Sequence, residues 1–409
     1  MTKYKNTLLP LLVVCLALSI QLLPSGRILD LLALKALYAL RGHLPAPSEV
    51  VMVAIDDQTY ASLTASTNYH LPRRFIAEAL LKLHELAPTA IILDTKFPKE
   101  KRDDPEGSQK LIDAISTARA PIWEGLETFA FIDDLVTDPQ ILNASPLQFS
   151  ASMAGEEGSV IYLGNPLGNS GVALASPPVK NVVGPNTSPE ILAALYETLP
   201  WSKPLIVGAA KAISVPPKDA LINFYGPTNT IQRLSLGALL STPKTREEAE
   251  KLKALINKKI VIIGYQSRQL ARGVIGKDEF PVPVSSSGLF PLEIHATIIA
   301  NLLDASWIAP LPKWVQCAAI VVVSILTTWV ALWLTTLKAV AIILFIPIAL
   351  SALATVLFTH YATFTPGLTT MILASIAALL IAIIQSFIRS QRFEQKVKQT
   401  FKFEIAREI

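Results

Sequence analysis

The chain has 409 residues, of which 51% are hydrophobic and 17% are charged, and its formal net charge at pH 7 is +4. So weak a net charge argues against a protein dedicated to nucleic-acid binding, and the charged fraction lies below the roughly 25% of typical soluble domains. The sequence has two cysteines, Cys15 and Cys317, both in apolar runs, so the long segment between them has no disulfide framework.

The first predicted element is an apolar segment at the N-terminus. Leu8–Leu23 follows Lys3 and Lys5 and has 16 mostly apolar residues, fewer than the ~20 of a usual spanning helix. Because no small-x-small cleavage pattern follows it, we predict an uncleaved transmembrane signal anchor over residues 1–24. A cleaved signal peptide is the alternative. A helical pattern continues over residues 27–40.

Strands and helices alternate in the next part of the chain. A short β-branched run at residues 50–55 predicts a buried strand, and the apolar stripe of residues 73–86 predicts an amphipathic helix. A second strand is predicted at 90–93 and a helix at 106–118. A third strand begins at 121–123.

Residues 133–202 are rich in Pro, Gly, Ser and Asn and give no order of elements, but regular patterns return after them. The later elements are a strand, two helices, a strand and a last helix, at 220–225, 231–240, 245–256, 259–264 and 291–303. Strands that alternate with helices imply crossover connections and a sheet covered on both faces. We therefore predict an α/β domain with a mixed, mostly parallel sheet over residues 25–313.

Polar residues follow the predicted strands where ligands collect in parallel sheets. Asp56 and Asp57 follow the first strand, Asp94 follows the second, and Gly264 ends a later one. If these strands are parallel neighbours, three carboxylates share one edge of the sheet. They would form a cation or ligand site, because like charges repel unless they are neutralised. Alternatively, one carboxylate caps the next segment and another pairs with Arg73.

His295 is a further candidate, on the last predicted helix of this domain beside Ile294, Ile298 and Ile299. A histidine on such a helix fits a hydrogen-bonded core residue, and a pH-sensing role is the alternative. The sequence has no zinc signature, phosphate-binding glycine loop or Gly-x-Ser-x-Gly motif. We therefore assign no catalytic residue, metal ligand or cofactor, and whether the protein is an enzyme stays open.

Three apolar segments within residues 314–388 are each long enough to cross a membrane. They are Trp314–Leu337, Ala339–Phe358 and Leu368–Ile388, and none has a charged residue in its interior. Transporters and proton pumps generally need ionisable groups at that depth. These segments therefore predict a membrane bundle without transport chemistry.

Basic residues orient the chain in the membrane. If the chain has four spans, one side of the membrane contains all of these basic residues: Lys3, Lys5, Lys338, Arg389, Arg392, Lys396 and Lys398. Positive residues beside spans favour the cytoplasmic side. We therefore predict a multi-pass protein of a bacterial inner membrane, with both termini in the cytoplasm and residues 25–313 on the periplasmic or extracellular side.

The C-terminal segment, residues 389–409, has one apolar and one basic face. Phe393, Val397, Phe401 and Ile405 are spaced four residues apart. A signalling coiled coil, a membrane-surface helix, a capping helix and a disordered segment all fit this pattern, and strict heptads are too few to choose a coiled coil. We predict a cytoplasmic helical linker here.

Seven short segments between residues 36 and 303 carry a family resemblance. They are ALYALRGHLP, VVMVAIDDQTYASL, LPRRFIAEALLKL, AIILDTKF, INFYGP, KKIVIIGYQ and LEIHATIIANLL. Their order and spacing resemble the type-two CHASE domain, the cyclases/histidine kinases associated sensory extracellular domain. Asp56 and Asp57 match the family's strand-end Asp-Asp, Asp94 matches its second strand-end Asp, and residues 293–296 match its last helix motif.

The resemblance implies a sensor. Such proteins typically have an N-terminal anchor, an extracytoplasmic sensor domain, three further transmembrane helices and a cytoplasmic adenylate or guanylate cyclase or protein kinase. We therefore expect the sensor and transmembrane signalling module of a receptor, with its output domain outside residues 1–409. The signal would be an unidentified small molecule or periplasmic protein, and a homodimer is expected because such outputs work in pairs. The alternative is a structural or scaffolding subunit of a cell-envelope complex.

Overall fold

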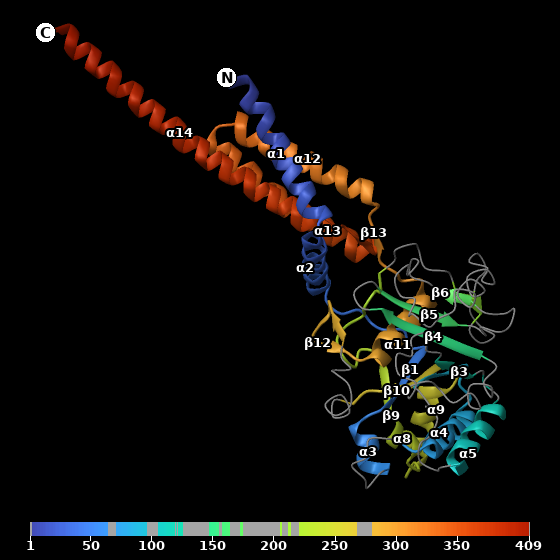
Figure 1. Ribbon diagram of the computed structural model, residues 1–409. Coiled ribbons are helices and arrows are strands. Elements are labelled where there is room, and N and C mark those ends of the chain that lie inside the picture. The colour runs from blue at the N-terminus through green and yellow to red at the C-terminus, as the bar shows by residue number, and fades with distance from the viewer. Residues whose placement is uncertain are drawn as a thin grey trace. The chain divides into compact units, whose positions relative to one another are not determined.

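The computed structural model separates the chain into a helical unit, Met1–Gly42 with Ala309–Ile409, and an α/β unit, His43–Ile308 (Figure 1). The structure describes residues 2–63, 71–95, 105–118, 120, 122–125, 147–154, 158–163, 172–174, 205–206, 212–213, 221–267 and 280–408. The helical unit includes the predicted anchor, residues 1–24, and continues to Gly42.

The α/β unit contains an eight-stranded sheet with the strand order β6-β5-β4-β3-β2-β10-β1-β9. Its strands are β1 (Val50–Ile55), β2 (Ala90–Asp94), β3 (Ile122–Gly125), β4 (Leu147–Ala154), β5 (Gly158–Leu163), β6 (Val172–Leu174), β9 (Gln232–Ser235) and β10 (Ile260–Tyr265). Pairing is parallel from β9 to β4 and antiparallel from β4 to β6. The predicted mixed, mostly parallel sheet is confirmed.

Short hairpins accompany this sheet. They are β7 (Leu205–Ile206) with β8 (Ala212–Ile213), and β11 (Phe280–Val282) with β12 (Ser285–Leu289). Residues 133–202, for which no order of elements was predicted, lie largely outside the described residues, although β4, β5 and β6 fall within that range.

Helices lie on both faces of the sheet (Figure 1). They are α3 (Asp57–Leu63), α4 (Arg73–Leu86), α5 (Pro105–Ser116), α8 (Leu236–Leu240), α9 (Arg246–Ile256) and α11 (Pro291–Asp304). Alternate strand residues such as Val53 and Ile263 form one core with Leu80 and Leu83 of α4 and Leu111 of α5. Each such buried side chain contributes ~2 kcal/mol. Helix α11 covers β1 and β10 on the other face.

Two predicted elements after residue 219 are wrong. Residues 221–225 form only an isolated bridge, from Leu221 to Ile308, because side-chain hydrogen bonds to Asn301 take the place of a strand ladder at Asn223. Residues 231–240 are not one helix, because Gln232–Ser235 forms the edge strand β9 before the short helix α8.

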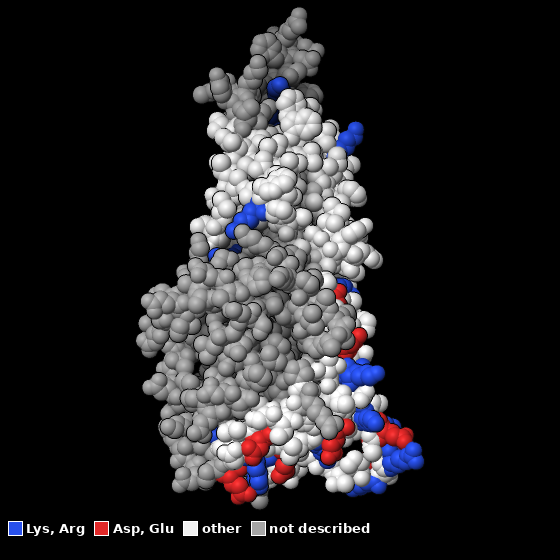
Figure 2. Space-filling model, turned by 90° about the vertical axis from the view of Figure 1, so that its right-hand side faces the viewer, with Lys and Arg blue, Asp and Glu red and all other residues white. Residues whose placement is uncertain are grey.

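The helical unit contains α1 (Thr2–Leu22), α2 (Pro24–Arg41), α12 (Lys313–Trp333), α13 (Thr336–Tyr361) and α14 (Leu368–Glu408). The last three are long and apolar enough to cross a membrane, and α1 with α2 passes the same test as a pair bent by 80°. A short parallel pair, β13 (Ala309–Pro310) with β14 (Thr363–Phe364), joins the segment before α12 to the α13–α14 loop. On the face shown in Figure 2, this unit has a broad uncharged surface with few Lys and Arg. These helices indicate a membrane protein.

The last predicted span and the predicted linker form one helix. Helix α14 continues for 41 residues without a break, about 60 Å at 1.5 Å per residue. A helix of that length exceeds the ~30 Å hydrocarbon layer, so its C-terminal part extends beyond the span.

Candidate functional site

Asp56 lies at the C-terminal end of β1 and caps the helix that follows. All six residues of β1 are buried, and helix α3 begins at Asp57. Asp56 Oδ1 accepts hydrogen bonds from the Thr59 backbone N–H, at 2.9 Å, and from Thr59 Oγ1, at 2.8 Å. This is the N-cap arrangement, in which a side-chain oxygen takes an otherwise unpaired N–H of the first helical turn.

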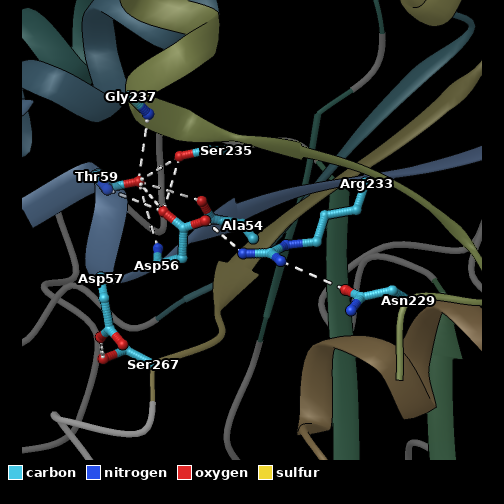
Figure 3. A network of polar contacts seen from close by, with 9 residues as sticks. All are labelled: Ala54, Asp56, Asp57, Thr59, Asn229, Arg233, Ser235, Gly237 and Ser267. Carbon is cyan, nitrogen blue, oxygen red and sulfur yellow. Dashed lines mark hydrogen bonds and ion pairs between the residues drawn. The ribbon is translucent and has the colours of Figure 1, made fainter. Parts of the chain in front are cut away.

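The edge strand β9 supplies the remaining partners of Asp56 (Figure 3). Ser235 Oγ donates to Oδ1 at 2.8 Å, and Arg233 forms an ion pair with Oδ2. Arg233 and Ser235 are two residues apart, so their side chains lie on the same face of the strand. Arg233 also donates to Asn229 Oδ1 at 3.4 Å.

The Asp56 carboxylate is therefore enclosed and neutralised by protein groups. Its side chain is 8% exposed and that of Arg233 is 30% exposed. Thr59 Oγ1 also accepts from the Gly237 N–H at 3.2 Å, which ties α8 to the same point. This network joins β1, β9, α3 and α8, and the contacts favour a structural role for Asp56.

The arginine that pairs with Asp56 is Arg233, and not Arg73 as the sequence suggested. Arg73 is buried at the start of α4 and donates to Ser108 Oγ at 2.7 Å, linking α4 to α5. Arg233 was missed because residues 231–240 were predicted as a helix. The two polar residues Gln232 and Arg233 lie between the buried Ile231 and the half-buried Leu234, a pattern that fits an exposed edge strand.

Asp57 turns away from the Asp56 network (Figure 3). It is exposed, lies in the first turn of α3 and accepts a hydrogen bond from Ser267 Oγ, just after β10. An acidic residue at this position is also favoured by the helix dipole. Asp57 therefore connects the start of α3 to the end of β10.

Asp94 pairs with His295 at the C-terminal ends of the strands. Asp94 Oδ2 lies 2.8 Å from His295 Nδ1, and the side chains are 16% and 5% exposed. Asp94 is in register with Gly264, and Gly264 with Ala54, so β10 lies between the two aspartate-bearing strands. The pair attaches α11 to the C-terminal end of β2.

Gly264 allows α11 to pass close to the sheet. A Cβ atom at this position would lie 2.9 Å from the Asp94 carbonyl oxygen and 2.9 Å from Leu292 Cδ1. Such distances are too short for a side-chain carbon, so any larger residue would displace α11 or the strand. Gly264 therefore has a packing role beside the Asp94–His295 pair.

A chain of hydroxyl groups lies near the same C-terminal strand ends, and the sequence did not predict it. The Tyr60 hydroxyl donates to Tyr265, which also has a hydrogen bond with Thr95. Burial raises the pKa of both tyrosines, and for Tyr60 the neighbouring Tyr265 and Asp57 act in the same direction. Both phenols therefore stay protonated at neutral pH.

Helix α11 has two further polar attachments, to residues 223–229. Glu293, which is buried, accepts from the Asn229 N–H at 2.8 Å and from the Phe290 N–H at 3.3 Å. Asn301, at the other end of α11, accepts from the Asn223 N–H at 2.7 Å and donates to its carbonyl at 3.0 Å. The helix is thus fixed along its length by buried hydrogen bonds.

The candidate carboxylates therefore lie along one edge of the sheet, but each has its own protein partners. Among the described residues, no three His, Cys, Asp or Glu side chains are close enough to hold a metal ion. Arg73 lies elsewhere, at the α4–α5 contact, while Gly264 and His295 adjoin Asp94. The arrangement joins helices to strand ends and gives α11 a defined position.

An α/β unit with a mostly parallel sheet, joined to a unit of membrane-length helices, defines the class as a membrane protein with a folded domain. Residues 11–329 match the model of the CHASE2 domain family. Because this match covers most of the chain, the protein belongs to the CHASE2 family, as the resemblance predicted. No curated protein and no solved structure matches the chain.

Proposed function

We propose that the chain is the sensor and transmembrane part of a signalling receptor in a bacterial inner membrane. In this proposal the α/β unit lies outside the cytoplasm, both termini lie inside, and α14 leads to a cyclase or kinase output. Membership of the CHASE2 sensor family and the three candidate membrane helices support a sensor module. The signal is a small molecule or a periplasmic protein.

The observation that carries the proposal is the short connection from α11 to α14. The chain leaves the α/β unit at Ile308, and the next residues bond to the loop before α14. The Ala309 N–H donates to the Ala362 carbonyl at 2.8 Å, and the Leu311 N–H to the Phe364 carbonyl at 2.9 Å. A displacement at the end of α11 would therefore act directly on the start of the 41-residue helix.

Positive charge supports the orientation. Lys338 follows the break between α12 and α13, and Arg389 donates to the Leu332 carbonyl at 3.0 Å, near the end of α12. These groups, with Arg392, Lys396 and Lys398 on α14, gather at one end of the candidate spans. Under the positive-inside rule that end faces the cytoplasm.

Cysteine labelling tests the topology. In a Cys15→Ala, Cys317→Ala background, single cysteines replace Lys253 on α9 or Gln395 on α14, both exposed. A membrane-impermeant maleimide should label the Lys253→Cys variant in cells whose outer membrane has been opened. It should label Gln395→Cys only after the inner membrane is permeabilised. The opposite pattern would overturn the proposed orientation.

Crosslinking tests dimerisation and signal transmission. Phe393 is 70% exposed on α14, and the Phe393→Cys variant should form a disulfide between two copies. In a receptor, Asp94→Ala should change the rate of this crosslinking, because it releases α11 from the end of β2. A strict monomer would overturn the proposed mechanism. An unchanged rate in a stable dimer would favour the scaffolding alternative.

A further inference from the structure

The N-terminal apolar segment contains a sharp bend. Helix α1 ends at Leu22, Leu23 is extended, and Pro24 begins α2 at an angle of 80°. Proline suits the first position of a helix because it has no N–H to satisfy. Gly26 permits the bend, since a Cβ atom there would collide with the Gln21 carbonyl. Helix α2 therefore does not continue the direction of α1.

One face of α2 packs across the ends of two other helices. Tyr38 stacks edge to face on Phe358 of α13 with ring centroids 5.0 Å apart. Asp30 Oδ1 accepts from the Gly367 N–H at 2.6 Å, at the start of α14. The Leu29 carbonyl accepts from Thr369 Oγ1 at 3.0 Å. Helix α2 therefore lies at the level where α13 ends and α14 begins.

The level at which α13 ends and α14 begins is one membrane thickness from the other end of the helical unit. The opposite end is marked by Arg389, which donates to the Leu332 carbonyl near the end of α12. Between Gly367 and Arg389, α14 has an apolar run, Leu368–Ile388. At ~1.5 Å per residue this run spans about 30 Å, the thickness of the hydrocarbon core. Helix α2 is thus at one boundary of that core.

The other face of α2 is mostly apolar and projects away from the bundle. Ile28, Leu31 and Leu32 are 61%, 63% and 58% exposed. Leu22 and Leu23 at the bend are also exposed, so this surface continues from the exposed leucines of α1. It therefore extends the apolar surface that α1 would present to lipid.

The charges of α2 fit a lipid surface. Arg27 and Lys35 are exposed, and Lys35 lies on the same face as Leu31 and Leu32. Asp30, the acidic residue of α2, is instead turned inward to Gly367. Apolar and basic residues together are typical of helices that lie in the headgroup region, where a lysine on the apolar face extends its ammonium group towards the headgroups. A second copy on this face would bring like cations together, because a two-fold contact repeats the same patch.

We propose that α2 is a membrane-surface helix whose exposed face enters the boundary between lipid headgroups and acyl chains. It is distinct from a continuation of the N-terminal span. The outer leaflet is assigned from the topology proposed above, whereas the depth of α2 does not depend on it. Its role would be to hold the start of α14 at a constant depth through Asp30.

Spin labelling of the full chain in lipid vesicles tests this depth. Single cysteines replace Leu31 or Leu32 in the Cys15→Ala, Cys317→Ala background. Controls are Lys253→Cys for water and Leu380→Cys, 56% exposed within the span, for the acyl interior. The measurement compares collisions of the label with oxygen, which concentrates in lipid, and with a soluble nickel complex.

We expect collision ratios for the Leu31→Cys and Leu32→Cys variants between those of the two controls. A ratio equal to that of Lys253→Cys would place the face in water and overturn the proposal. Low collision rates with both reagents, with dipolar broadening between labels, would assign the face to a second copy and also overturn it. Crosslinking of the Phe393→Cys variant in vesicles of the same lipid composition tests the receptor function separately, so the two failures are distinguishable.

Discussion

Replacing Asp56 with alanine removes one acceptor shared by four donors. These are the backbone N–H and hydroxyl of Thr59, the hydroxyl of Ser235 and the guanidinium of Arg233. The lost helix cap alone costs ~1 kcal/mol. Removing one partner of a buried ion pair costs ~3–5 kcal/mol. Because the Arg233 side chain is 30% exposed, the cost for this pair should be at the lower end of that range. We expect Asp56→Ala to lower the free energy of opening of β1 by about 3 kcal/mol.

A double-mutant cycle separates the ion pair from the other contacts. Arg233→Ala should cost about 1–2 kcal/mol, because the carboxylate keeps its donors from Thr59 and Ser235. If Asp56 and Arg233 stabilise the fold as a pair, the double variant should cost less than the sum of the single variants by about 1 kcal/mol.

Hydrogen exchange of the full chain in nanodiscs, followed by mass spectrometry on peptides covering β1, measures these costs. Glu247→Ala is the control, since Glu247 and Lys251 form an exposed pair with side chains 76% and 74% exposed. Such pairs are worth roughly 0.5 kcal/mol or less. A cost below about 1 kcal/mol for Asp56→Ala, or strict additivity, would refute the structural role and favour the ligand interpretation.

Three further substitutions test the attachment of α11 and the half-buried tyrosines. Gly264→Ala should lower the free energy of unfolding in urea by about 1–3 kcal/mol, because its Cβ would lie 2.9 Å from Leu292 Cδ1; an unchanged midpoint would contradict the close packing. Asn301→Ala should cost about 2–4 kcal/mol, since two buried backbone groups of Asn223 lose their partners, and slow exchange of the Asn223 amide should be lost. Burial raises the pKa of Tyr265, so above pH ~10 the unfolded chain loses a proton that the folded chain keeps. Stability should therefore fall as the pH rises above that value, and Tyr265→Phe should reduce the slope of thermal unfolding temperature against pH.

The parallel core of the sheet could be predicted because its signals are local. Residues 50–55 and 260–264 are continuous β-branched or apolar runs that are buried on both faces. The helix predicted at 73–86 begins and ends at the predicted residues. For these elements burial pattern and local propensity agree, so tertiary packing does not override the local preference.

The partners of Asp56 and Asp94 could not be predicted, because they are distant in sequence. Arg233 is 177 positions from Asp56, and His295 is 201 positions from Asp94. Strand periodicity places a carboxylate at a strand end, but the partner depends on strand order and on the edge strand β9. The bend at Leu23 was not predicted, because the hydropathy of a segment says nothing about the direction of its helix axis. Only Pro24 and Gly26 indicate the bend locally.

The contacts of α11 suggest how the proposed receptor would respond to a signal. Glu293, His295 and Asn301 form hydrogen bonds to two segments, residues 223–229 and Asp94, so moving a single turn of α11 would leave polar groups unpaired, at ~1–3 kcal/mol each. Moving the helix as a rigid body together with residues 223–229 retains the bonds of Glu293 and Asn301. The rigid-body movement therefore needs less free energy, and a ligand that binds one position of α11 more tightly would favour it. Because Ile308 leads directly to the strand pair before α14, that movement would reach the long helix as a displacement of its first turn.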